Sequence, residues 1–193
     1  MNLTLIDYIT GKMVPDVGAE GSRQLVEKFL VENRGYERTD VVVDVPIKVM
    51  FKGEVYASTV DLVVFCKDKP LMALRCVAGS LGSYEREILA AARLVYDVQI
   101  PFSVSTNGKD ALVRDVLSGK AISCRSNGDK YQTGEGLEAI PKKEEGIKLV
   151  ESFQYIPFPP EKKEREMVIF RSYDIQRNEG ECDASPFLTG QIL

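Results

Sequence analysis

A chain of 193 residues, 44% hydrophobic and 28% charged, is expected to form one compact domain with a core. Its formal net charge of -4 argues against a protein that coats nucleic acid through bulk electrostatics, although a local basic patch is compatible with that charge. No apolar run approaches the roughly 20 residues that span a bilayer, and residues 1–7 lack the basic start of a secretory leader. We therefore expect a cytoplasmic protein without a membrane partner.

The chain contains no histidine, and its cysteines lack the spacing of a metal site. Without histidine, the Ser-His-Asp and Cys-His mechanisms are excluded, so a hydrolase would need carboxylates, a metal ion or an activated lysine. No Cys-x-x-Cys pair is present, so a structural zinc site is not expected. We expect Cys66 and Cys76 to be small buried thiols in strands. The other two cysteines are Cys124 and Cys182.

The first predicted helix covers residues 19–33 and follows a lead-in, residues 1–18, that contains a short strand or turn over residues 8–13. Gly35 stands where a helix C-cap is expected. Four apolar residues recur at helical spacing in this segment: Leu25, Val26, Phe29 and Leu30.

Runs of β-branched and aromatic residues, bounded by turn residues, predict the strands. They cover residues 41–45, 47–51, 55–57, 58–65, 71–77, 99–105 and 111–117. Pro46 is expected to separate the first two, and residues 52–54 have the composition of a hairpin turn. A helix is predicted over residues 83–96, with Ser80 or Ser83 as its cap. This alternation predicts an α/β fold, with a central mixed β-sheet flanked by helices.

The C-terminal third is predicted to be helical and peripheral. Residues 123–138 are polar and contain glycine, which is typical of a loop. Surface helices are predicted over residues 141–153 and 161–170, within a C-terminal helical extension that covers residues 139–175. Residues 176–193 are expected to be a flexible tail, and residues 19–122 form the main domain.

Several short motifs occur in a characteristic order along that domain. They are Glu20-Gly-Ser-Arg-Gln24, Gly35-Tyr36, Val60-Asp61-Leu-Val-Val64, Lys69-Pro-Leu71, Ile100-Pro101, Thr106-Asn-Gly108 and Asp115-Val-Leu-Ser-Gly-Lys120. In this order the chain resembles the N-terminal domain of the type I restriction enzyme R subunit, a nuclease of the PD-(D/E)xK class with the restriction-endonuclease-like fold. It is similar, in particular, to a bacterial subgroup of small stand-alone proteins.

The resemblance assigns site residues one position at a time. Glu20 matches an acid on the first helix of the family, and Asp61 matches the metal-binding Asp at the end of its strand. Arg75 falls where the motif has Glu, and Val77 where it has Lys. Mg²⁺ needs clustered oxygen ligands, so a guanidinium in this place repels the ion. The resemblance therefore implies a degenerate nuclease site with no cofactor.

An Arg beside an Asp most simply forms a bidentate ion pair. We therefore expect Arg75 to neutralise Asp61, with Glu20 as its second partner. Two rescues remain open. Glu85 or Glu87, on the following helix, could replace the missing strand carboxylate. Arg86 or Arg93 could replace the missing lysine. A solvated helix face is the favoured interpretation of these four residues.

Three functions follow. The leading interpretation is a restriction-endonuclease-like domain that no longer cuts and acts as a structural module or binds nucleic acid or protein. Its phosphate contacts would come from Lys109, Arg114, Lys120, Arg125 and Lys130, for which ordinary surface charge is the favoured interpretation. The alternative is an active Mg²⁺-dependent DNA endonuclease with migrated ligands, with Asp61 as the metal ligand. The third is a subunit-interface protein that forms a homo-oligomer through residues 153–158, a segment equally consistent with intramolecular packing.

Overall fold

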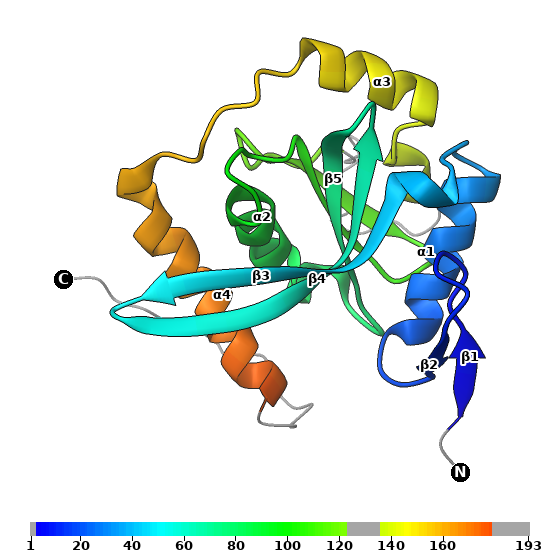
Figure 1. The fold of residues 1–193 in the computed structure, drawn as a ribbon, viewed down its shortest axis with the longest axis horizontal. Coiled ribbons are helices and arrows are strands. Elements are labelled where there is room, and N and C mark those ends of the chain that lie inside the picture. The colour runs from blue at the N-terminus through cyan, green and yellow to red at the C-terminus, as the bar shows by residue number, and fades with distance from the viewer. Residues whose placement is uncertain (1–2, 123–135, 179–193) are drawn as a thin grey trace, which may run out of the picture.

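The computed structural model describes residues 3–122 and 136–178. Its centre is a five-stranded mixed sheet (Figure 1) with the strand order β3 (Val41–Phe51), β4 (Glu54–Cys66), β5 (Lys69–Cys76), β6 (Phe102–Thr106) and β7 (Ala111–Asp115). Neighbouring strands are antiparallel except β5 and β6, which are parallel because the helix α2 (Glu85–Leu94) crosses between them. The predicted α/β fold with a mixed sheet is confirmed.

Helices cover both faces of this sheet. Along β4, Leu62 and Val64 belong to one hydrophobic core and Val63 to another, as alternation of side chains across a sheet requires. The first core includes residues of α1 (Glu20–Glu32) and α3 (Lys143–Ser152). The second includes residues of α2 and is lined by Met167 of α4 (Pro160–Asn178). In Figure 1, α1 and α2 accordingly lie on opposite sides of the sheet.

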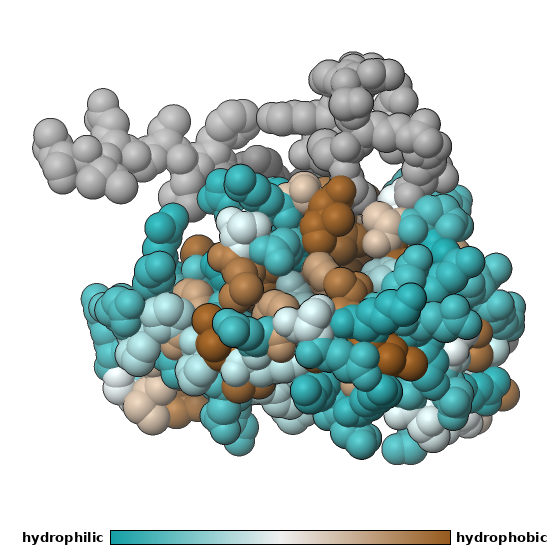
Figure 2. All heavy atoms as spheres, turned by 90° about the horizontal axis from the view of Figure 1, so that it is seen from above, coloured by the Kyte–Doolittle hydropathy of each residue, from teal (hydrophilic) through white to brown (hydrophobic). Residues whose placement is uncertain are grey.

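The short elements complete the chain. The N-terminal hairpin, which we define as residues 3–17, contains the two-stranded sheet of β1 (Thr4–Ile6) and β2 (Met13–Pro15). Three 3-10 turns are η1 (Arg38–Asp40), η2 (Leu81–Ser83) and η3 (Leu137–Ala139). None of the helices in the two described ranges is both long enough and apolar enough to cross a membrane. Hydrophilic residues cover most of the face shown in Figure 2, with apolar residues gathered near its middle.

Both predicted helix caps are wrong. Asn33 caps α1, and Gly35 lies two residues further on, where its φ of +78° lets the Tyr36 N–H reach the Leu30 carbonyl at 3.1 Å. Neither Ser80 nor Ser83 caps α2, which begins after Tyr84 without a side-chain cap.

The predicted break at Pro46 is also wrong. Pro46 lies inside β3 and pairs with Thr59, which is tolerated because β3 is an edge strand. The irregularity in β3 occurs instead at Asp44, whose φ is +53°. On β4, the predicted strands 55–57 and 58–65 form one continuous strand.

The remaining boundaries shift by a few residues. The predicted strands 71–77, 99–105 and 111–117 correspond to β5, β6 and β7. Both C-terminal helices are present, and α4 continues eight residues beyond position 170, into the segment expected to be a tail. Most of the predicted loop, residues 123–135, and the remainder of the predicted tail lie outside the described residues.

Candidate functional site

Arg75 is the centre of a buried ion-pair cluster that joins β4, β5 and α2. Asp61 lies one step beyond the paired residues Leu62 and Leu74, so it faces Arg75 across the two strands. Arg75 Nη1 donates to Asp61 Oδ1 at 2.6 Å, and Arg75 Nη2 donates to Glu87 Oε1. The expected pairing of Arg75 with Asp61 is confirmed as a contact, but its expected bidentate geometry is wrong, because one hydrogen bond joins the two side chains. The second partner is Glu87 and not Glu20.

Both oxygens of Asp61 are engaged. Oδ2 accepts the backbone N–H of Cys76 at 2.7 Å, while Oδ1 is bound to the guanidinium. The exposed fractions of the Arg75 and Glu87 side chains are 3% and 2%, against 18% for Asp61. Burial alone would lower the pKa of Arg75, but the charges of Asp61 and Glu87 outweigh it and raise that pKa. The cation is therefore fixed in place and permanently charged.

Val77 occupies the other altered position without polar chemistry. It is buried, and its backbone N–H donates to the Thr106 carbonyl at 2.8 Å. The side chain of the preceding residue, Cys76, faces the first core, and burial raises its pKa well above the ordinary value. This strand end therefore offers an apolar surface where a lysine would supply a charge.

A second buried ionic cluster surrounds Arg23 on α1. Arg23 Nη2 donates to Glu20 Oε1 at 2.7 Å, and Gln24 Nε2 donates to the same oxygen at 2.9 Å. Glu20, predicted to approach Arg75, is instead neutralised within its own helix. The sequence interpretation did not identify Arg23, although it stands three residues after Glu20 on the same helix face.

Three more carboxylates belong to this cluster, and none was identified from the sequence. Asp7, from the N-terminal hairpin, is 1% exposed and lies 3.1 Å from Arg23 Nη2. Glu27 is fully buried, and its Oε1 lies 3.8 Å from Arg23 Nε. Asp44 Oδ2 lies 3.5 Å from Arg23 Nη1. The cluster thus ties the hairpin, α1 and β3 together around one guanidinium.

Glu27 carries the largest carboxyl pKa shift of this cluster. Burial, followed by the negative charge of Asp7, raises its pKa from 4.5 to about 7, against the opposing charge of Arg23. For Asp7, burial acts upward, but hydrogen bonds from Thr10 and the charge of Arg23 leave the pKa below 3.8. Neighbouring carboxylates in one cluster therefore differ in how readily they keep a proton.

Asp44 links the two clusters. It lies between the pairs Val43–Leu62 and Val45–Val60, which places it opposite Asp61 on the adjacent strand. Burial and the charge of Asp61 raise the pKa of Asp44, although Arg23 lowers it. Like charges facing each other across a ladder destabilise a sheet. Here Arg23 near Asp44 and Arg75 at Asp61 offset part of this repulsion.

A divalent metal fits this arrangement poorly. Mg²⁺ takes oxygen ligands in near-octahedral order, whereas both Asp61 oxygens already bind donors and Arg75 fills the space between Asp61 and Glu87. Within the described residues, no group of three or more His, Cys, Asp or Glu side chains is placed to hold a metal ion. The residues present do not fit the ion that the nuclease motif holds.

Comparison with known protein families identifies the family of this chain. The model of the family described as type I restriction enzyme R protein N terminus matches residues 18–141. The chain belongs to this family. Neither the curated proteins nor the solved structures yield a match to it. The matched region begins just before α1 and ends after η3, so it contains the Arg75 cluster and, except for Asp7, the Arg23 cluster.

In this restriction-enzyme family member, the residue of α2 that contributes to the Arg75 site is Glu87. Glu87 reaches Arg75, so the expectation of a solvated face is wrong for this residue. Glu85 instead pairs with Arg114 at 2.7 Å, and Arg86 is exposed. Arg93 donates to Glu166 at 2.8 Å and to the Val116 carbonyl, away from the site, so neither arginine replaces the motif lysine.

The residues predicted to contact phosphate differ in how far their charges are engaged by other groups. Lys109 and Lys120 are exposed, whereas Arg114 is held by Glu85 and by the Gly119 carbonyl at 2.7 Å. Arg125 and Lys130 lie outside the described residues.

The segment 153–158 packs within the chain. Tyr155 donates its hydroxyl to the Pro70 carbonyl at 2.8 Å, and Phe158 is buried. The Ile156 carbonyl accepts the backbone N–H of Gln99 at 3.0 Å. Of the two interpretations that the sequence left open for this segment, the structure favours intramolecular packing.

Proposed function

We propose that this chain is a nuclease-type domain of the restriction-enzyme R family that does not hydrolyse phosphodiesters and serves as a module that binds nucleic acid or protein. The observation that carries the proposal is the Arg75 guanidinium, held between Asp61 and Glu87 in the sheet. Metal-assisted hydrolysis needs carboxylates to fix the ion and a lysine or metal-bound water to supply the hydroxide. In this chain the carboxylates bind a side chain instead.

The burial of the Arg75 ion pairs supports the same proposal. A buried ion pair is maintained only when its partners remain together, because removing one leaves an uncompensated charge in the interior. A metal ion would have to displace Arg75 from both Asp61 and Glu87, and the guanidinium would then be buried without a carboxylate partner. We expect this exchange to be unfavourable at physiological Mg²⁺ concentrations, and Arg75 then serves the fold and not catalysis.

The competing proposal is an active Mg²⁺-dependent endonuclease that uses Glu85 or Glu87 as a migrated ligand. The position of Glu87 supports this competing proposal, because Glu87 is the α2 carboxylate that reaches the Arg75 cluster. Against it stands the contact itself, since Glu87 reaches Arg75 and Glu85 is paired with Arg114. The two proposals make opposite predictions about metal binding.

The deciding experiment is a calorimetric titration of the purified protein with Mg²⁺ and Mn²⁺, run beside cleavage assays on plasmid and single-stranded DNA. We expect the same titration curve for the wild-type protein and for Asp61→Ala, and no metal-dependent cleavage by either. Arg75→Glu is the matched positive control, because it removes the cation and adds a third carboxylate beside Asp61 and Glu87. We expect this variant to gain Mn²⁺ binding.

Cleavage by the wild-type protein that needs Mg²⁺ and disappears in Asp61→Ala would establish the active endonuclease instead. The binding part of the proposal is tested separately. Salt-dependent retention on DNA tests a nucleic-acid partner, and light scattering tests association with a second copy.

A further inference from the structure

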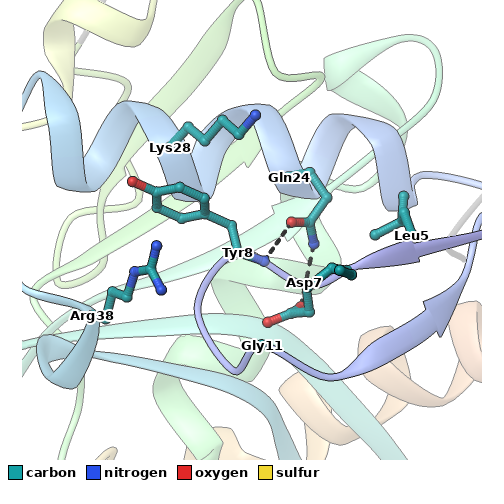
Figure 3. A pocket seen from close by; sticks show the side chains of 8 residues that line it. Leu5, Asp7, Tyr8, Gly11, Gln24, Lys28 and Arg38 are labelled. Atoms are coloured by element: carbon teal, nitrogen blue, oxygen red, sulfur yellow. Dashed lines mark hydrogen bonds between the residues drawn. The ribbon is translucent and has the colours of Figure 1, made fainter.

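A groove of about 380 Å³ opens between the N-terminal hairpin and α1, beside the Arg23 cluster (Figure 3). Its walls include Leu5 and Tyr8 of the hairpin and Gln24 of α1. Gln24 accepts the Tyr8 backbone N–H at 2.7 Å and donates to Asp7 at 3.2 Å, which fixes this part of the wall. The groove is therefore built by two elements that hydrogen bonds hold together.

Two cations meet at the tyrosine ring of this groove. The guanidinium carbon of Arg38 lies 4.4 Å from the ring centroid of Tyr8, and Lys28 Nζ lies 5.9 Å from it. Figure 3 shows Lys28 of α1 above the ring in this view, with its amino group directed away from it, and the Arg38 guanidinium just below the ring. Cation–π contacts of this kind hold a guanidinium or ammonium in place without neutralising its charge.

Among the described residues, no carboxylate forms an ion pair with Lys28 or Arg38. By contrast, the buried or half-buried arginines each have a carboxylate partner: Arg23, Arg34, Arg75, Arg93 and Arg114. Both groove cations are exposed and lie within one groove of a chain whose net charge is -4. Both charges are therefore available to an anion at the surface.

The nearby carboxylates are engaged in other contacts. Asp7 is almost fully buried and pairs with Arg23, with further hydrogen bonds from Thr10. Glu32 accepts the Tyr8 hydroxyl at 3.0 Å, which orients the ring and leaves the Glu32 carboxylate charged. The mouth of the groove therefore presents Lys28 and Arg38 beside the exposed carboxylate of Glu32.

We infer that this groove binds the phosphodiester backbone of nucleic acid, with Lys28 and Arg38 contacting phosphate oxygens on either side of Tyr8. A guanidinium held against an aromatic ring presents its planar fork to two oxygens, while the lysine adds a mobile point charge. Leu5 and the tyrosine ring offer apolar surface to a sugar or base next to the phosphate. This inference rests on the proposed function and specifies the surface through which it would act.

The test compares two variants with equal charge. Lys28→Gln/Arg38→Gln removes the groove cations, and Lys163→Gln/Arg165→Gln removes two exposed cations from α4, which packs on the other face of the sheet. Binding of fluorescein-labelled 20-nucleotide single-stranded and duplex DNA is followed by anisotropy across a salt series. We expect the groove variant to lose about tenfold in affinity and, because two phosphate contacts are removed, to reduce the salt slope by about 1.8 on duplex DNA and about 1.4 on single-stranded DNA. We expect the α4 variant to stay within about twofold of the wild-type protein.

Each other outcome has a defined meaning. Equal losses in both variants indicate bulk charge and overturn the groove assignment, as does an unchanged affinity in the groove variant. If polyglutamate of matched charge competes as well as DNA, the site is a general anion site and the phosphodiester assignment is wrong. If the wild-type protein binds no oligonucleotide even at low salt, the nucleic-acid part of the proposed function fails, while its metal titration remains a separate result. The single variants Lys28→Gln and Arg38→Gln provide the same readout if the double variant does not fold.

Discussion

Glu87 of α2 and Arg75 of β5 form an ion pair in which neither side chain is more than 3% exposed. A buried pair of this kind contributes little when both partners are replaced, but it costs about 3–5 kcal/mol when one partner is removed. We predict that Arg75→Met lowers the free energy of unfolding by that amount, and Glu87→Met by a similar amount. Arg75→Met/Glu87→Met should cost no more than either single change, which corresponds to a coupling energy of at least about 3 kcal/mol by urea denaturation.

The pair Arg114–Glu85 is the matched control, because it joins the same helix to β7 but is about one quarter exposed. Its double-mutant cycle, with Met at both positions, should give a coupling energy below about 1 kcal/mol. If the two cycles give the same coupling energy, burial does not strengthen the Arg75 pair, and its role in stabilising the fold is wrong.

Glu27 makes stability depend on pH above the range of ordinary carboxyl titration. Its pKa is raised from 4.5 to about 7 in the folded protein, so between these values the unfolded chain releases the proton first. Stability should therefore fall as pH rises from about 4.5 to about 7 and level off above, at a cost of about 3 kcal/mol. We predict that Glu27→Gln abolishes this decline and is more stable than the wild-type protein at pH 8 in urea denaturation.

Glu164→Gln, at an exposed position of α4, provides the control for the loss of one carboxyl group. It should keep the wild-type pH profile between pH 4.5 and 7. Asp7 acts in a separate range, because its lowered pKa gives stability that is lost only as pH falls below its ordinary value of 3.8. A decline that persists in Glu27→Gln would assign the titration to another group.

Local pattern predicted the sheet and the Arg75–Asp61 contact, because both depend on alternation along two adjacent strands. For Glu87 the sequence left a contact with the site open but favoured a solvated face, because the residue lies at the border of the apolar face, beside Ile88 and one turn before Ala91. Its burial depends on how α2 packs on the sheet, which periodicity alone does not determine.

The Arg23 cluster could not be predicted for a different reason. It needs Asp7 from the N-terminal hairpin and Asp44 from a left-handed residue within β3, both distant from α1 in sequence. Arg23 and Glu27 have the four-residue spacing of an exposed helical ion pair, yet both are buried where α1 meets the hairpin and the sheet. The same docking creates the groove at Tyr8, which sequence alone gave no reason to expect.

Gly146 allows α3 to approach the sheet closely. A Cβ at this position would lie 2.7 Å from Leu71 Cδ2 and 2.9 Å from Cys66 Sγ, both buried in the first core. Alanine would gain up to about 1 kcal/mol in helix propensity, but overpacking costs about 1–3 kcal/mol. We predict that Gly146→Ala is destabilised by about 1 kcal/mol in urea denaturation. Gly79→Ala, where a Cβ meets nothing within 4 Å, should leave stability unchanged, and stabilisation of Gly146→Ala would show that α3 packs less tightly.

The buried thiols give a further measure of this packing. Cys66 and Cys76 are buried free thiols, and burial raises the pKa of each, so both lack the thiolate that reacts with alkylating agents and disulfide reagents. A Cys124→Ser/Cys182→Ser variant retains Cys66 and Cys76 as its thiols. In this variant we predict that a thiol reagent labels the native protein only at the rate at which the protein unfolds. Both thiols should react at once in 8 M urea, a control for reagent access. Labelling of Cys76 faster than global unfolding would mean that the strand end beside Arg75 opens locally, and the fixed-cation description of the site would then be wrong.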